Sequence, residues 1–132
     1  GKQPIRPGDD IQCPRECGLN ATVTKELIAR SWPEVFMASF KRWGISSDGA
    51  QSWKISTPVD FENVLVVGEG SPPYHLRGVI EHKGQYAHGG YYVSYVRAMD
   101  NYWYFCNDFE KPRQIPTAEV LRVEAYVLVY ER

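Results

Sequence analysis

The feature that most constrains the fold is an alternating pattern in residues 74–82, YHLRGVIEH. Successive side chains of an extended strand point to opposite faces, so this pattern predicts a regular strand. One face would carry Tyr74, Leu76, Gly78 and Ile80, and the other His75, Arg77, Val79 and Glu81. The fold must therefore contain a sheet that accommodates this strand.

Other segments rich in β-branched and aromatic residues predict further strands. Residues 91–99 and 102–108 flank the turn signal Asp100-Asn101 and together predict a hairpin. Residues 125–131, AYVLVYE, predict a buried strand near the end of the chain. Weaker strand candidates are residues 22–30 and residues 53–55, the latter as the returning strand of a hairpin.

Residues 35–40, VFMASF, predict a strand of a different kind. Val35 and Met37 would share one face with Ser39, and Phe36, Ala38 and Phe40 the other. Apart from Ser39 both faces are apolar, which favours a central strand covered on both sides.

Composition and punctuation predict the fold class. Aromatic residues make up 14% of the chain, with nine Tyr and four Trp, which favours β-structure. The best helix candidate is residues 116–123, with Pro116 in the first turn and Thr117 as its cap. We predict a β-rich α+β fold, with a mixed or antiparallel sheet and one or two short helices. Residues 1–12 are polar and read as a flexible lead-in, which leaves residues 13–132 as one domain.

Charge and cysteine content exclude several kinds of partner. The net charge is −1, so no basic surface is expected for nucleic acid. The apolar runs are far shorter than a membrane span, so no membrane partner is expected. Three cysteines without a signal peptide argue against a disulfide framework and predict a reducing compartment, the cytoplasm or nucleus.

Five segments resemble, in order, the motifs of one enzyme family. WPEVFMASFKRW (32–43) is similar to LPxxLxxxLKRF, and YHLRGVIEHKG (74–84) is similar to YxLxxVxxHxG. HGGYYVSYVR (88–97) resembles GGHYxAYxR, and WYFCND (103–108) resembles WxxFDD or WxxFND. PTAEVLRVEAYVLVYER (116–132) resembles EEVLxxxAYxLxYxR. The ordered set resembles the C-terminal half of the catalytic domain of ubiquitin-specific proteases.

This resemblance implies the palm and part of the fingers of a papain-like cysteine protease, over residues 13–132. In the family the palm carries a catalytic His and a third Asp or Asn, while an N-terminal box, GNTCYxN, carries the nucleophilic Cys. No segment of this chain matches that box.

The position of the family's catalytic His, between Gly90 and Tyr92, is occupied by Tyr91. A phenol with a pKa of about 10 is not a base near neutral pH. Tyr91 therefore marks an inactive member of the family or, in the simpler reading, is an ordinary strand aromatic. Asn107 matches the third triad position and Asp108 the neighbouring polar residue, whose role in an intact member of the family is to polarise a water or the oxyanion.

Other candidate residues have simpler explanations. His88 lies three residues before Tyr91 and is predicted to point to the other face, so it would not replace the base. His82 is predicted to be a structural histidine bonded to nearby backbone. Cys106 is predicted to be a buried small apolar residue.

Zinc is the one cofactor that the resemblance suggests, and it is not expected here. Cys13 and Cys17 fall where the family's fingers often carry half of a four-Cys zinc site. Their spacing is CxxxC rather than CxxC, and a structural zinc site requires four ligands. We therefore predict no cofactor.

Three functions follow from the resemblance. The first is a non-catalytic module that binds ubiquitin, a ubiquitin-like protein or another protein, and its expected contacts, besides Tyr91, are His88, Gly89, Gly90, Tyr92, Trp103 and Tyr104. The second is part of an active thiol-dependent deubiquitinase whose Cys-bearing half lies elsewhere. The third is a scaffold that has lost ubiquitin binding and uses an apolar surface for oligomers or a new partner.

Overall fold

The structure is a computed structural model, and it describes residues 2–4, 24–26 and 28–132. The chain divides into two units, residues 1–32 and residues 33–132. In the first unit, β1 (Lys2–Pro4) pairs antiparallel with β2 (Thr24–Glu26). Three residues of the predicted lead-in are therefore in a strand, and of the strand predicted over residues 22–30 the structure shows Thr24–Glu26. Cys13 and Cys17 lie outside the described residues.

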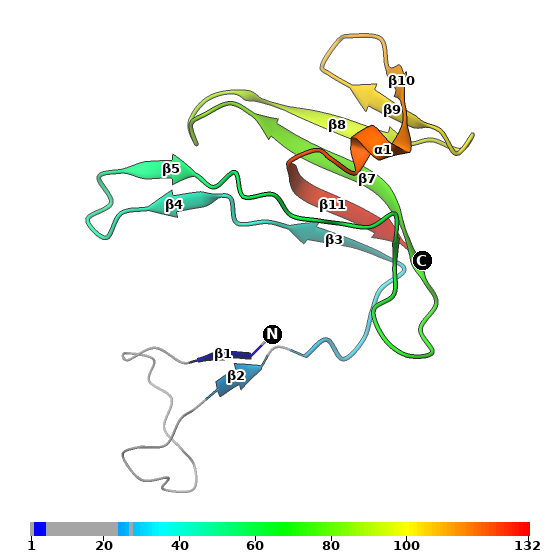
Figure 1. The fold of residues 1–132 in the computed structure, drawn as a ribbon, viewed down its shortest axis with the longest axis horizontal. Coiled ribbons are helices and arrows are strands. Elements are labelled where there is room, and N and C mark those ends of the chain that lie inside the picture. The colour runs from blue at the N-terminus through cyan, green and yellow to red at the C-terminus, as the bar shows by residue number, and fades with distance from the viewer. Residues whose placement is uncertain (1, 5–23, 27) are drawn as a thin grey trace, which may run out of the picture. The chain divides into compact units, whose positions relative to one another are not determined.

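The second unit is built on one antiparallel sheet (Figure 1). Its strand order is β10-β9-β8-β7-β11-β3, and β6 pairs with the first two residues of β7. The strands are β3 (Val35–Ser39), β6 (Val64–Leu65), β7 (Tyr74–Lys83), β8 (Tyr91–Arg97), β9 (Trp103–Cys106), β10 (Arg113–Ile115) and β11 (Ala125–Glu131). The strand-rich α+β prediction, the β8–β9 hairpin and the buried terminal strand are confirmed.

A separate hairpin extends from the end of β3 (Figure 1). It pairs β4 (Trp43–Ile45) with β5 (Ser52–Lys54), which confirms the returning strand predicted near residues 53–55. The turn is stabilised by Asp48, whose carboxylate accepts hydrogen bonds from the Ser46 hydroxyl at 2.5 Å and the Ala50 N–H at 3.0 Å. These two bonds lower the pKa of Asp48.

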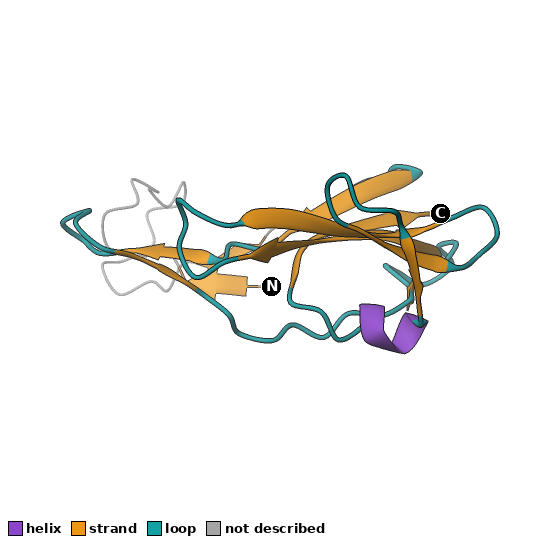
Figure 2. Cartoon of the chain, turned by 90° about the horizontal axis from the view of Figure 1, so that it is seen from above, coloured by secondary structure: helices purple, strands orange, loops and turns teal. Residues whose placement is uncertain are grey.

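One face of the sheet carries the core. Helix α1 (Thr117–Val120) and loop segments lie against this face (Figure 2). The buried apolar residues are Tyr74, Leu76, Val79, Val93, Tyr95, Trp103, Ile115, Val120, Ala125, Leu128 and Tyr130. On the other face, Val35 and Met37 are 50% and 71% exposed. Of the described helices, α1 has four residues and is too short to cross a bilayer.

The predicted face of residues 74–82 holds only for the first part of β7. Leu76 lies opposite Tyr130 and Gly78 opposite Val129, so Arg77 is an extra residue in β7. Such a bulge reverses which residues point to each face. Val79 and Glu81 are therefore buried, at 0% and 7% exposure, together with Tyr74 and Leu76 rather than opposite them. The prediction of one continuous face was wrong beyond Leu76.

Two further predictions are corrected. β3 is not a central strand, because in the described sheet it pairs only with β11 and ends the strand order. Helix α1 has four residues, and Pro116 rather than Thr117 occupies the N-cap, with no side-chain capping bond. Proline has no backbone N–H. The first turn of a helix needs none for its internal hydrogen bonds, so Pro116 fits there. Strand β10 was not predicted, because Arg113–Ile115 is short and polar.

Candidate functional site

An open hollow of about 640 Å³ lies at the end of the sheet where β8 begins and β9 ends. It is lined by Tyr91, Tyr92, Asn107, Asp108 and Glu110. The antiparallel pairing explains why these residues lie together. Ser94 lies opposite Cys106, so the residues before Ser94 and those after Cys106 share one end of the hairpin. The structure thus brings together the three residues predicted from the triad positions.

Tyr91 is set at the hollow by the glycines before it. Gly90 has φ of +93°, and a Cβ there would lie 2.0 Å from the carbonyl oxygen of Lys83. Only glycine allows the chain to enter β8 in this way. Tyr91 and Tyr92 are 55% and 57% exposed, so both aromatic side chains are open to a partner.

Asn107 is hydrogen-bonded within its own turn. Its side-chain amide donates to Oε1 of Glu110 at 3.2 Å, and the Glu110 N–H donates to the Asn107 carbonyl at 2.9 Å. Asp108, between them, has φ of +48° in the left-handed region, where a short polar side chain is tolerated. Glu110 was missed by the sequence reasoning, although its position three residues after Asn107 was a usable signal.

Neither His82 nor His88 is among the described residues that line the hollow. His82 is 6% exposed, and its Nε2 donates to the Gly89 carbonyl at 2.9 Å. Because a carbonyl only accepts, Nε2 must carry the proton. The ring also packs edge-on against Trp43 and Tyr92, with centroids 5.2 Å and 5.0 Å away. The prediction of a structural histidine bonded to backbone is confirmed, while His88 is exposed in the loop before β8.

Two predicted binding residues are placed away from the hollow. Trp103 is 2% exposed in the core, so the prediction that its ring contacts a partner is corrected. The Tyr104 hydroxyl donates to Oδ2 of Asp100 at 2.5 Å, in the turn at the other end of β9. This bond raises the pKa of Tyr104, and the same bond lowers the pKa of Asp100.

Cys106 immediately precedes Asn107 but does not line the hollow. It is a free, partly buried thiol whose Sγ is 4.0 Å from the carbonyl oxygen of Tyr104. Its burial is less complete than predicted. In the described part of the chain, no group of three or more His, Cys, Asp or Glu side chains is arranged to hold a metal. The weak zinc candidates Cys13 and Cys17 remain untested predictions.

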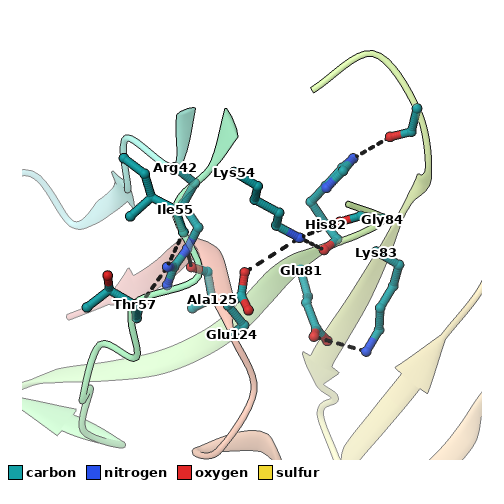
Figure 3. Close-up of polar contacts among 11 residues, drawn as sticks. Arg42, Lys54, Ile55, Thr57, Glu81, His82, Lys83, Gly84, Glu124 and Ala125 are labelled. Carbon is teal, nitrogen blue, oxygen red and sulfur yellow. Dashed lines mark hydrogen bonds and ion pairs between the residues drawn. The ribbon is translucent and has the colours of Figure 1, made fainter. Parts of the chain in front are cut away.

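A polar cluster borders the loop that leads to Tyr91 (Figure 3). The Lys54 ammonium donates to the carbonyls of His82 at 2.8 Å and Gly84 at 3.0 Å, and lies 3.5 Å from Oε1 of Glu124. Arg42, 3% exposed, donates from Nε to the Ala125 carbonyl at 2.8 Å. The sequence reasoning missed these residues, because their acceptors are backbone groups brought near only by the fold.

A second buried network involves Glu81. Its two carboxylate oxygens accept from the Tyr95 hydroxyl and the Lys83 ammonium, each at 2.9 Å. Burial, and then the hydrogen bond to Glu81, raise the pKa of Tyr95. The network explains how a carboxylate is accommodated on the core face of β7.

Known proteins are similar to this chain in sequence. The family model described as ubiquitin carboxyl-terminal hydrolase matches residues 9–130. The mouse ubiquitin carboxyl-terminal hydrolase 17-like protein C is 33% identical over 129 residues, which cover 96% of this chain and 23% of that protein. The Arabidopsis thaliana ubiquitin carboxyl-terminal hydrolase 1 is 32% identical over 130 residues, which cover 82% of this chain and 12% of that protein.

Solved structures share its fold. A chain of the yeast SAGA DUBm with an Sgf73 mutant has a TM-score of 0.83 at 25% identity, over 99% of this chain and 30% of that chain. A SAGA DUB module bound to monoubiquitin gives a TM-score of 0.81 at 24% identity, which is a likeness of fold alone, over the same shares. This chain therefore spans less than a third of each of these relatives. The motifs, the antiparallel palm-like sheet and the family match agree, and the chain belongs to the ubiquitin carboxyl-terminal hydrolase family, as part of a ubiquitin-specific protease catalytic domain.

Proposed function

We propose that this chain is a palm module that binds ubiquitin or a ubiquitin-like protein without cleaving it. The observation that carries the proposal is Tyr91 beside Asn107 in a hollow whose described lining contains no imidazole. A cysteine isopeptidase needs a His that takes the thiol proton and a polar group that orients this His. Here a phenol, which is a poor proton acceptor, occupies that place, and the Asn107 amide is bonded to Glu110.

The hollow offers a binding surface for an extended peptide tail. Tyr91 and Tyr92 present apolar rings with polar hydroxyls, and Phe109 in the adjoining turn is 99% exposed. Gly90, which directly precedes Tyr91, is exposed and leaves its backbone accessible for pairing with an extended partner. The Asp108 and Glu110 carboxylates favour a tail that carries cationic side chains. A partner in ubiquitin conjugation would place the chain in the cytoplasm or nucleus.

An NMR titration tests this function. The amides of the ¹⁵N-labelled chain are followed as unlabelled ubiquitin is added to about 1 mM, the range of weak specific binding. We expect saturable shifts between residues 88 and 108 that Tyr91→Ala weakens. Met99→Ala is the matched control, because Met99 is fully exposed in the turn at the other end of the β8–β9 hairpin. No shifts in that range would contradict the proposal.

The second candidate is part of an active deubiquitinase. The family match and the short share of each relative that the chain covers favour it. It requires a cysteine-bearing half and a base that Tyr91 does not supply. Hydrolysis of a ubiquitin C-terminal fluorogenic substrate would favour this candidate over a binding module.

The third candidate is a scaffold, favoured by the apolar face of the sheet opposite the core. Val35, Met37 and Val96 are 50%, 71% and 43% exposed on that face. Exposed apolar residues mark a protein contact where they form one continuous patch. Light scattering tests it, since a strict monomer at all concentrations would count against an oligomer.

A further inference from the structure

Lys54 is unusual among the lysines whose side chains the structure describes, because its side chain is largely enclosed. Its side chain is 11% exposed, whereas lysines are almost always on the surface. It reaches from β5 to two carbonyls, those of His82 at the end of β7 and Gly84 in the following loop (Figure 3). The Glu124 carboxylate, 3.5 Å from the ammonium, balances the charge. Burial of a cation with this many acceptors fixes the acceptors as well as the cation.

The same loop, residues 84–90, is bound a second time near its other end. The His82 imidazole donates to the Gly89 carbonyl at 2.9 Å, and Trp43 and Tyr92 fix the ring plane. Gly84 and Gly90 have φ of +142° and +93°, so this loop depends on residues that are flexible by themselves. The largely enclosed Lys54 side chain and the buried His82 ring therefore restrain the two ends of a loop that glycine alone would leave mobile.

We propose that Lys54 and His82 are positioning residues that hold loop 84–90, and through it Tyr91 and Tyr92, in a binding-competent arrangement at the hollow. Both tyrosines follow directly on this loop, and Tyr92 also touches the His82 ring. Preorganisation of a loop lowers the entropy lost when a partner binds. The effect on partner affinity rests on the proposed function, whereas the effect on the free loop does not.

The free chain tests the positioning role first. We expect Lys54→Met to lower the ¹H–¹⁵N heteronuclear NOE of amides 84–90, while amides of the core strand β11 keep theirs. Lys54→Arg, which restores a cation with several donors, should return the loop values toward those of the wild type. Lys41→Met is the control, because Lys41 is exposed. Unchanged loop amides in Lys54→Met would overturn the proposal, and equal loosening in Lys41→Met would also overturn it.

A measurement on the unsubstituted chain decides the matter if Lys54→Met does not fold. An enclosed ammonium exchanges its protons slowly, so Lys54 should give a resolved ammonium signal in a ¹H–¹⁵N spectrum at a pH where Lys41 gives none. Absence of that signal would overturn the proposal.

Ubiquitin affinity separates the positioning role of Lys54 from the proposed ubiquitin binding. If the wild type binds, Lys54→Met should weaken binding about tenfold by the loss of preorganisation, and Lys54→Arg by less. Equal affinity of Lys54→Met and wild type would contradict the positioning role. If the wild type does not bind, the proposed function fails, and the loop dynamics still decide whether Lys54 holds the loop.

Discussion

His82 and Tyr91 lie at the two ends of one loop and have opposite surroundings. His82 is 6% exposed, hydrogen-bonded and packed between rings, whereas Tyr91 is 55% exposed at the hollow beside Asn107. The His82 imidazole therefore serves structure, and the exposed position at the hollow carries a phenol. The presence of a histidine near a triad-like Asn is not enough for base catalysis, because the ring must face that Asn.

The largest expected effect is at Arg42, which is buried as His82 is. Arg42→Met should lower the free energy of unfolding by about 3 kcal/mol, because three backbone carbonyls lose the charged guanidinium that donates to them. Those acceptors are the carbonyls of Ala125, Ile55 and Thr57. Urea denaturation measures the loss. The exposed Arg122→Met is the control and should change it by less than about 0.5 kcal/mol, and equal losses would contradict the assignment.

His82→Ala should have the next largest effect. Loss of the Gly89 bond and of the ring contacts should cost about 2 kcal/mol of unfolding free energy. Thermal and urea unfolding of the variant measure this value. An unchanged unfolding free energy in His82→Ala would show that the His82 ring does not stabilise the fold.

Tyr91→Ala should separate stability from binding. Because Tyr91 is exposed, the unfolding free energy should change by less than about 0.5 kcal/mol. Ubiquitin affinity should fall about tenfold if its ring contacts the partner, as for an interface aromatic. A large loss of stability with unchanged affinity would reverse the roles given to Tyr91 and His82.

The smallest effect is a dependence of stability on alkaline pH. The folded-state pKa of Tyr95 is raised, first by burial and then by its bond to Glu81. A raised folded pKa stabilises the fold below the unfolded pKa of about 10, and this contribution is lost as pH rises above it. We expect the unfolding free energy to decline above about pH 10, and less steeply in Tyr95→Phe. The same slope in both proteins would remove Tyr95 from the explanation.

The sequence predicted those parts of the site that depend on local pattern. The hairpin between residues 91–99 and 102–108 follows from its turn signal, and it brings Tyr91 near Asn107 and Asp108. The bulge at Arg77 was not predictable, because it depends on the register with β11. The edge position of β3 depends on which strands become neighbours.

Burial decided the residues that were misassigned. Trp103 and Tyr104 are adjacent, but the pleat sends Trp103 into the core and leaves Tyr104 bonded to Asp100. Likewise, the Lys54 contacts join segments 28 and 30 residues apart, and no local pattern encodes them.

In the proposed function, the hollow beside Asn107 does not support cleavage. Release of a fluorophore from the C-terminus of ubiquitin by the chain tests it most directly, with an active family member as the positive control. We expect no release above buffer from the wild type or from Tyr91→His alone, because no thiol of the described residues lines the hollow. Turnover by either protein would contradict the proposed function, and its loss in Cys106→Ala would identify Cys106 as the nucleophile.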